Sequence, residues 1–414
     1  MATNTGFYDD LETRAPEQRE AAFLAALRVQ LAHAKAHAPA FAGILADVDP
    51  ADIVDRRTLA LLPVTRKSAL IERQRAAPPF GGFAAVAPGA LARIFSSPGP
   101  IYDPEGRRAD YWRMARSLYA AGFRAGDIVH NCFSYHLTPA GSMLESGAHA
   151  LGCAVIPGGT GQSEQQVRTI ADLKPAGYVG TPSFLAIILD QAAKLGSDLA
   201  CLTRALVSGE AFPAALRQRF AAAGIDALQC YATADLGLIA YESPAREGLI
   251  LDEGIIVEIV QPGTGDPIGP GGVGEVVVTT LTPDYPLIRF ATGDLSAYLP
   301  GTSPCGRTNH RIKGWMGRAD QATKVRGMFV QPAQIAELVK RHKEIIRARL
   351  VVARDAKGDD EMTLKIEMGE PEENVARIAE TLQALTKLRG TVLRVPTGSL
   401  PNDGKIIDDI RPPD

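Results

Sequence analysis

The spacing of apolar and polar residues changes along the chain and divides it into segments of different expected structure. Residues 16–36 place most of their apolar side chains on one side of a helix, with charged residues around them, which predicts an amphipathic helix. From residue 110 to residue 208, short apolar runs alternate with helical patterns. We expect strands at residues 127–133, 154–157, 178–180 and 205–208, and helices at residues 110–122, 147–151, 162–173 and 182–195. This alternation predicts a parallel sheet with helices on both faces.

The pattern changes after about residue 242, where β-branched runs are separated by turns rich in glycine and proline. Residues 255–260 and 274–280 are such runs, and we expect a small antiparallel β subdomain over about residues 243–313. Beyond residue 316 a new unit is expected. Its predicted helices are residues 332–342 and 372–387, and its predicted strands are residues 348–353, 362–367 and 392–395. The expected fold class is α/β, with a large N-terminal domain of mixed and parallel sheets over residues 1–316 and a small mobile α+β domain over residues 317–414.

Composition excludes several classes of protein. The chain has 414 residues, a formal net charge of −3 and no basic stripe, so we expect no nucleic-acid partner. Its five cysteines are scattered, which argues against a disulfide framework and favours a cytoplasmic location. The N-terminus lacks the basic and then apolar layout of a signal peptide. The sequence has no run of about 20 apolar residues, so no membrane span is predicted.

Three sequence blocks, taken in order, carry the most specific signal. Arg-Phe-Ala-Thr-Gly-Asp-Leu occupies residues 289–295, a glycine- and arginine-bearing block occupies residues 317–332, and Ser-Leu-Pro-Asn-Asp-Gly-Lys-Ile occupies residues 399–406. Together they resemble the adenylate-forming superfamily of acyl- and aryl-CoA synthetases. Residues 62–67 (Leu-Pro-Val-Thr-Arg-Lys) and 279–289 are similar to its phenylacetate–CoA ligase-like branch. The resemblance implies a cytoplasmic AMP-forming ligase that uses ATP, Mg²⁺ and CoA to activate a small carboxylic acid, aromatic or not.

The resemblance also implies a nucleotide site. Asp294 is expected to accept hydrogen bonds from the ribose hydroxyls, because a carboxylate can accept from two neighbouring hydroxyls at once. The turn formed by Ser208, Gly209 and Glu210 is expected to meet adenine, on which Tyr231 could stack. The remaining nucleotide-binding and catalytic candidates are Arg318 (ribose or phosphate), Thr233 (phosphate) and Asp235 (Mg²⁺, where the family has glutamate). Each position also has an ordinary structural explanation, because Gly-Asp is a common turn pair and the strand end near Tyr231 could simply be buried.

Other candidate residues concern the later steps of the reaction. Lys405 is the expected catalytic ammonium, because positive charge offsets the repulsion between the carboxylate of the acid and the α-phosphate. Asp320 is the expected hinge, followed by a loop that serves thiolation through Lys324, Arg326 and Gly327. The acyl pocket is expected beside Tyr135, His136 and Phe184. The alternative for Lys405, Asp320 and the loop at residues 324–327 is that they form exposed turns without a catalytic role. The alternative for the three pocket residues is that they are core or surface side chains.

The chain departs from the family pattern at the phosphate loop. The family has Ser-Ser-Gly-Thr-Thr-Gly there, whereas this chain has Ser96 and Ser97 followed by Pro-Gly-Pro at residues 98–100. Proline has no N–H to donate, and Asp103 and Glu105 add negative charge near the expected triphosphate. The chain therefore either binds ATP with a weaker phosphate grip or does not adenylate.

A second departure concerns metal. Some relatives hold zinc with cysteine and histidine, but here Cys305 lacks the expected partners, and we predict no zinc site. The alternatives to a ligase are a non-adenylating homologue that binds AMP, acyl-adenylate or acyl-CoA without cleaving ATP, and an interaction protein on the same scaffold. A carrier-protein thiol in place of CoA and a homodimer also stay open, and the acid is not identified.

Overall fold

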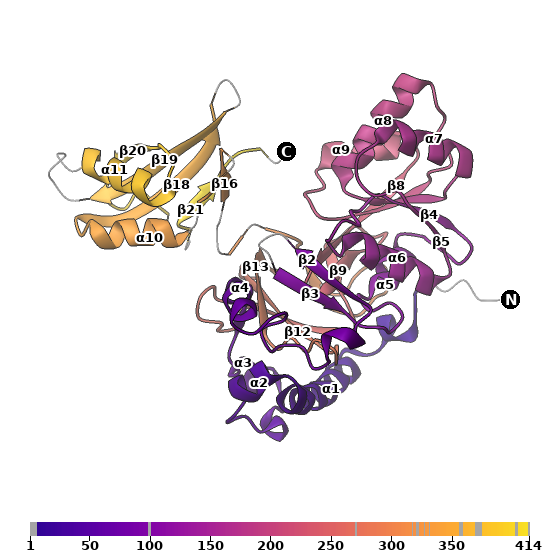
Figure 1. Ribbon diagram of the computed structural model, residues 1–414, viewed down its shortest axis with the longest axis horizontal. Helices are drawn as coiled ribbons and strands as arrows, with labels where there is room; N and C mark the ends of the chain where they lie inside the picture. Colours follow the sequence, from indigo (N-terminus) through magenta and orange to yellow (C-terminus); the bar gives the residue numbers. More distant parts are fainter. Residues whose placement is uncertain are drawn as a thin grey trace. The chain divides into compact units, whose positions relative to one another are not determined.

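The structure is a computed structural model. It describes residues 6–97, 101–269, 271–316, 318–319, 323–326, 328–330, 332–355, 359–368, 375–401 and 405–412. The chain divides into two compact units, Met1–Met316 and Gly317–Asp414, which we describe separately (Figure 1).

A nine-stranded mixed sheet forms the centre of the first unit, in the order β14-β15-β10-β9-β8-β7-β6-β4-β5. Strands β5, β4, β6, β7 and β8 are parallel, and the other pairings are antiparallel. The bounds are β4 Ile128–Asn131, β5 Ala154–Pro157, β6 Gly177–Gly180, β7 Arg204–Val207, β8 Asp226–Thr233, β9 Gly237–Glu242, β10 Leu249–Leu251, β14 Tyr298–Leu299 and β15 Arg311–Ile312. The predicted parallel sheet is confirmed.

Helices cover both faces of this sheet, as the strand pattern predicts. Successive residues of a strand point to opposite faces, so Leu206 packs into one apolar cluster while its neighbours Ala205 and Val207 pack into another. The first cluster lies against α5 (Met114–Ala120) and α6 (Ala140–Leu151). The second lies against α7 (Ser163–Leu173), α8 (Pro182–Leu195) and α9 (Ala214–Ala222), which gather beyond β4 and β8 in Figure 1.

Two predicted helices differ in length from the observed ones. α5 begins at Met114 and not at residue 110, because Asp110 and Arg113 have φ values of 47° and 63°, which a right-handed helix does not allow. α6 begins at Ala140, well before the predicted residue 147. Gly141 and Ser142 are buried in this helix, so tertiary packing outweighs their weak helix propensity.

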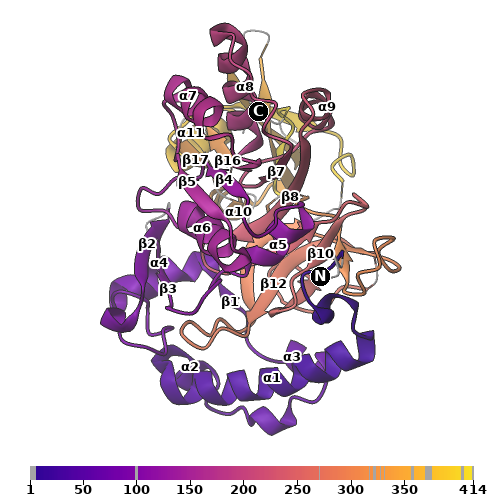
Figure 2. The same ribbon diagram turned by 90° about the vertical axis from the view of Figure 1, so that its right-hand side faces the viewer.

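A second, four-stranded sheet has the order β1-β13-β12-β11. Its strands are β1 Thr65–Arg66, β11 Ile255–Val260, β12 Gly274–Thr280 and β13 Phe290–Ser296. Phe23 and Leu27 of α1 (Pro16–His37) belong to the same buried cluster as Val276 and Phe290, and Figure 2 shows α1 below this sheet. β11 and β12 match the predicted runs, whereas the short strands β10, β14 and β15 of the same region pair with the nine-stranded sheet.

The remaining elements of the first unit are short. They are η1 Asp10–Thr13, α2 Pro39–Ile44, η2 Pro50–Asp52, α3 Arg56–Ala60, α4 Lys67–Ala76, η3 Pro88–Ala90 and the hairpin strands β2 Arg93–Ser97 and β3 Ile101–Glu105.

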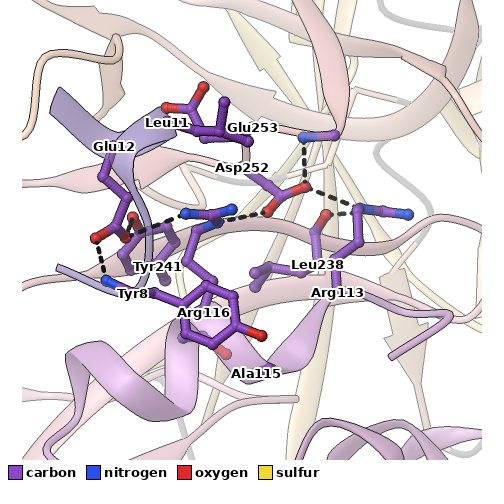
Figure 3. A network of polar contacts seen from close by, with 12 residues as sticks. Tyr8, Leu11, Glu12, Arg113, Ala115, Arg116, Leu238, Tyr241, Asp252 and Glu253 are labelled. Atoms are coloured by element: carbon purple, nitrogen blue, oxygen red, sulfur yellow. Dashed lines mark hydrogen bonds and ion pairs between the residues drawn. The ribbon is translucent and has the colours of Figure 1, made fainter. Parts of the chain in front are cut away.

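A buried polar network fastens the N-terminal segment to this unit (Figure 3). Glu12 is 1% exposed and accepts hydrogen bonds from the Tyr241 hydroxyl (2.7 Å) and from Arg307 Nε (3.1 Å). Arg116 donates two bonds of 2.8 Å to Asp9 and lies 3.6 Å from Glu12. Because removing one partner leaves buried charge uncompensated, such a network strongly favours one position of the segment.

The second unit is a small α+β domain. Its sheet has the order β20-β19-β18-β21, and its described helices share one apolar cluster with the sheet. The bounds are β16 Thr323–Val325, β17 Met328–Val330, α10 Pro332–Arg341, β18 Ile345–Arg354, β19 Asp360–Met368, α11 Val375–Thr386, β20 Thr391–Val395 and β21 Ile407–Asp409. β16, β17 and β21 were not predicted. Among the described helices of the whole chain, none is long and apolar enough to cross a membrane.

Candidate functional site

Asp294 and Tyr231, the predicted ribose and adenine residues, come together at the junction of the two sheets. Asp294 lies on β13 and is 7% exposed. The Tyr231 hydroxyl, from β8, donates to its Oδ2 (2.7 Å), and Trp315 Nε1 donates to its Oδ1 (3.1 Å). A carboxylate can accept hydrogen bonds from several donors at once. Their roles toward a nucleotide stay predictions.

The predicted adenine turn links β7, β8 and α8. The Ser208 hydroxyl donates to the Cys230 carbonyl (2.7 Å), and the Glu210 carboxylate accepts from the Ser183 N–H (2.6 Å) in the first turn of α8. Gly209 has a φ of 86°, a conformation that glycine adopts without the steric cost of a side chain. The turn therefore follows the carboxyl end of a parallel strand, the edge where open α/β sheets bind ligands.

Thr233 and Asp235 lie at the tight connection between β8 and β9. The Thr233 hydroxyl accepts from the Leu236 N–H (3.3 Å), so it holds the turn in this structure. The Asp235 side chain is fully buried, and its Oδ2 receives the Lys67 ammonium at 2.5 Å. Lys67 begins α4 directly after β1, which pairs in parallel with β13, the strand that carries Asp294.

The degenerate phosphate loop is the connection of the β2–β3 hairpin. The Ser96 N–H donates to the Leu137 carbonyl (2.9 Å), and the Ser97 hydroxyl donates to the Ile101 carbonyl (3.3 Å). Residues 98–100 lie outside the described residues. Glu105 does not face a triphosphate unpaired, because it pairs with Arg93 (2.8 Å) and accepts from the Ser142 hydroxyl (2.8 Å).

Asp103 of the same hairpin is the unexpected member of the site. It is 0% exposed, and neither of its carboxylate oxygens has a hydrogen-bond partner. Burial, and then the neighbouring Asp235 carboxylate, raise the pKa of Asp103 well above its usual range. Asp235 Oδ1 is also buried without a partner. Unsatisfied carboxylate oxygens are suitable ligands for Mg²⁺, so these residues fit the metal that the family implies.

The predicted acyl-pocket residues lie in different layers. The Tyr135 hydroxyl accepts from Asn131 (2.8 Å) and donates to Glu145 (2.7 Å), while its ring lies close to Gly141 of α6. His136 is exposed, and Phe184 packs against the core of the α7–α9 layer. A cavity of about 1,150 Å³ lies elsewhere, between α1 and the four-stranded sheet, and no predicted site residue lines it. The acyl pocket stays a prediction.

The predicted lid residues belong to the second unit. Lys405 Nζ is 3.0 Å from Asp408, and the side chain is 47% exposed. Arg318 is half-buried, and Lys324 lies in β16. The Arg326 N–H donates to Asp360 (2.8 Å). Asp320, the predicted hinge, and Gly327 lie outside the described residues.

Cys305 is half-buried beside hydroxyl and guanidinium groups. Its Sγ lies 3.0 Å from Ser303 Oγ and accepts from Arg307 Nη1 (3.6 Å). Within the described part of the chain, no three His, Cys, Asp or Glu side chains gather as metal ligands would. The absence of zinc stays a prediction.

Sequence reasoning missed three residues of the site. In the sequence, Lys67 stands out only as part of a family-like stretch, Asp103 only as a charge near the phosphate loop, and Trp315 not at all. Their importance comes from long-range contacts, since Lys67 and Asp235 are 168 residues apart in the chain. The family-like stretch at residues 62–67 was the only signal in the sequence for Lys67.

Known proteins that are similar to this chain belong to the superfamily that its sequence blocks resemble. A family model described as "AMP-binding enzyme" matches residues 109–282. The chain is 32% identical to the phenylacetate-coenzyme A ligase of Aromatoleum evansii, over 92% of this chain and 89% of that protein. It is 30% identical to the ligase of the same name from Escherichia coli strain K12, over 98% of this chain and 97% of that protein.

A solved structure shows the same fold. The crystal structure of 2-hydroxyisobutyryl-CoA ligase in complex with 2-HIB-AMP and CoA matches with a TM-score of 0.75 and 24% identity, over 99% of this chain and 94% of that one. The near-complete coverage at 30–32% identity is decisive. The chain belongs to the phenylacetate–CoA ligase family of AMP-binding, adenylate-forming enzymes.

Proposed function

We propose that the protein is an ATP-dependent acid–CoA ligase that activates a small carboxylic acid through an acyl-adenylate. The observation that carries this proposal is the near full-length similarity to phenylacetate-coenzyme A ligases. The meeting of Tyr231, Asp294 and Trp315 at the expected ribose position supports it. The α/β architecture with a separate small C-terminal unit is also the one expected for such an enzyme.

The proposed reaction has two steps. In the first, a carboxylate oxygen of the acid attacks the α-phosphorus of ATP, a C–O–P linkage forms, and pyrophosphate leaves. In the second, the CoA thiol loses its proton and attacks the acyl carbonyl, the thioester forms, and AMP leaves. Both steps develop or shift negative charge, which fixed cations and hydrogen-bond donors stabilise most when they are already in place.

Individual residues receive roles in this scheme. Asp294 holds the ribose, and the turn at Ser208–Glu210 borders adenine. Lys405 brings an ammonium between the acid's carboxylate and the α-phosphate in the first step. Mg²⁺, which Asp235 would hold, supplies charge neutralisation at the phosphates when it is bound.

The decisive experiment measures pyrophosphate release with ATP, Mg²⁺ and a panel of acids that includes phenylacetate, benzoate and 2-hydroxyisobutyrate. We expect at least one acid to cause release and, with CoA added, to give a thioester detectable by mass spectrometry. Failure of every acid in a broad panel would refute a ligase. If a carrier-protein thiol replaces CoA, acid-dependent release will occur but CoA will give no thioester.

One observation favours a second candidate, a homologue that binds AMP or an acyl-adenylate without cleaving ATP. The phosphate loop lacks the family's threonines and contains two prolines, and buried Asp103 lies beside the expected triphosphate. Thermal stabilisation by AMP but not by ATP with Mg²⁺ would favour this candidate, because a ligand stabilises only the state that it binds. We also propose a cytoplasmic homodimer, which the molar mass in solution will test.

A further inference from the structure

Four carboxylate oxygens in the described part of the first unit are buried without a hydrogen-bond partner, and three of them belong to two neighbouring residues, the fourth being Oε1 of Glu258. Both oxygens of Asp103 and Oδ1 of Asp235 are in this state. A carboxylate oxygen removed from water without a partner costs free energy of about 1–3 kcal/mol or more. Three at one place therefore require an explanation, and a bound cation is one that gives a partner to all of them.

The chain positions Asp103 through specific contacts. The Gln74 side chain of α4 makes two hydrogen bonds with the backbone of Tyr102, the residue before Asp103. Its Nε2 donates to the Tyr102 carbonyl (2.9 Å), and its Oε1 accepts from the Tyr102 N–H (2.8 Å). Lys67, at the start of the same helix, reaches Asp235. One short helix thus holds the strand that carries Asp103 and also contacts Asp235, so the two carboxylates face each other from fixed backbones.

The charges at this site balance only when the two carboxylates hold a proton or a cation. With both carboxylates ionised, Asp103 and Asp235 carry two negative charges, and the Lys67 ammonium offsets one of them; the raised pKa of Asp103 reflects this excess of negative charge and its burial. Gln74, Tyr285 and Ser97 also lie around the pair, and none of these three carries a charge that could offset the second. A cation would restore the balance and fill the unsatisfied acceptor positions in one step.

We propose that Asp103 and Asp235 together hold a divalent cation, Mg²⁺ in the cell, and that this cation takes over part of the phosphate grip that the Pro-Gly-Pro loop cannot supply. Mg²⁺ prefers oxygen ligands and is commonly held by one or two carboxylates, with water and substrate phosphates completing the shell. The first part needs no nucleotide. The second part rests on the proposed function.

The test uses Mn²⁺ as the probe and the full-length protein without ATP or acid. The loss of the free Mn²⁺ signal in electron paramagnetic resonance measures binding directly. We expect the wild type to bind one Mn²⁺, with Mg²⁺ competing. Asp103→Asn and Asp235→Asn should each weaken binding by at least about tenfold. Glu105→Gln is the matched control, because it removes a carboxylate from the same strand whose partners are Arg93 and Ser142.

Several outcomes would overturn the inference. Wild-type protein that binds no Mn²⁺ at millimolar concentration, or Asp103→Asn that binds as tightly as wild type, excludes the two-carboxylate site. If Asp103→Asn raises the thermal midpoint while no variant binds Mn²⁺, the carboxylates share a proton and hold no metal. A second substitution, Asp103→Ser, guards against misfolding of the first, and circular dichroism checks both.

The same measurements separate this inference from the proposed function. Mn²⁺ binding that depends on Asp103, in a protein that releases no pyrophosphate with any acid, supports the metal site and refutes the ligase. Pyrophosphate release that is equal in wild type and Asp103→Asn, without Asp103-dependent Mn²⁺ binding, supports the ligase and refutes the metal site.

Discussion

The pH dependence of stability should change when Asp110 is replaced by asparagine. Asp110 precedes α5, and both of its carboxylate oxygens lie 3.2 Å from the Ala115 N–H. Burial, which outweighs this hydrogen bond, raises the pKa of Asp110 from 3.8 to about 6. The folded state therefore binds this proton more tightly than the unfolded state does.

The sign and size follow from linkage between protonation and folding. Below about pH 4 the carboxyl is protonated in both states, and its stabilising contribution is fully present. As pH rises from about 4 to about 6, the unfolded state loses the proton more easily and this contribution is lost. A difference of about two pKa units, at about 1.4 kcal/mol each, gives a loss of up to about 3 kcal/mol.

Asp110→Asn removes this dependence with little other change. The amide has the same shape, its oxygen can still accept from Ala115, and asparagine tolerates the positive φ of 47°. The free energy of unfolding of the variant, measured relative to wild type, should therefore improve by about 2–3 kcal/mol between about pH 4 and pH 7.5. Contributions from all other titrating groups cancel in this comparison.

Urea unfolding followed by tryptophan fluorescence measures the effect. Both tryptophans, Trp112 and Trp315, lie within the first unit, so the signal reports on that unit alone. Asp198→Asn is the matched control, because Asp198 is exposed and accepts one local bond from the Ala200 N–H. A relative stability of Asp110→Asn that stays constant with pH, or that falls as pH rises, would refute the reasoning.

Three further predictions test other parts of the molecule. Lys405→Ala should lower acid-dependent pyrophosphate release by about 100-fold or more. Asp408→Asn, which removes the half-buried carboxylate that pairs with Lys405 and lies 3.8 Å from Arg349, should change it little. Equal effects would contradict a catalytic role for the ammonium. Arg289→Met should lower the free energy of unfolding by about 3–5 kcal/mol. Arg289 is 2% exposed and donates hydrogen bonds to Glu258 and to the carbonyls of Ala60, Leu62 and Gly265, which the methionine would leave without a partner. A loss below about 1 kcal/mol in urea unfolding would show that these bonds contribute little. Cys305 should react with iodoacetamide at pH 8 faster than Cys201 does. Hydrogen bonds from Ser243, Ser303 and Arg307 outweigh burial and lower the pKa of Cys305, whereas burial raises the pKa of Cys201. Peptide mass spectrometry measures the labelling of both in one sample, and faster labelling of Cys201 would contradict this order of pKa values.

The parallel sheet could be predicted because its signal is local. β4, β6 and β7 are short apolar runs between helical patterns, and continuous apolar runs are typical of strands that are buried on both faces of a parallel sheet. Element ends were harder to predict. The start of α5 depends on the positive φ values of Asp110 and Arg113, and nothing in the local pattern indicates them.

The candidate site divides in the same way. Asp294 and Tyr231 could be proposed from sequence because each stands in a recognisable block, and the structure joins them by one hydrogen bond. Lys67 and Asp103 could not be assigned a role, because their significance depends on Asp235, which folding alone brings near them. A charge in the sequence does not reveal whether it will be buried or what will face it.

The two departures at the phosphate loop are best understood together. The loop sequence contains prolines, which cannot donate N–H groups to phosphate, and the following strand buries a carboxylate beside Asp235. Considered alone, the prolines weaken the binding of a triphosphate because they remove N–H donors, and the buried carboxylate weakens it because like charges repel. Taken together, they replace neutral donors with a pair of metal ligands, and a divalent cation bound there attracts the same phosphates that the bare carboxylates would repel. The affinity for nucleotide should therefore fall more when Mg²⁺ is removed than when a hydrogen-bond donor of the loop is replaced. Asp103→Asn should make the affinity less dependent on Mg²⁺ and should leave the Asp294 contact in place.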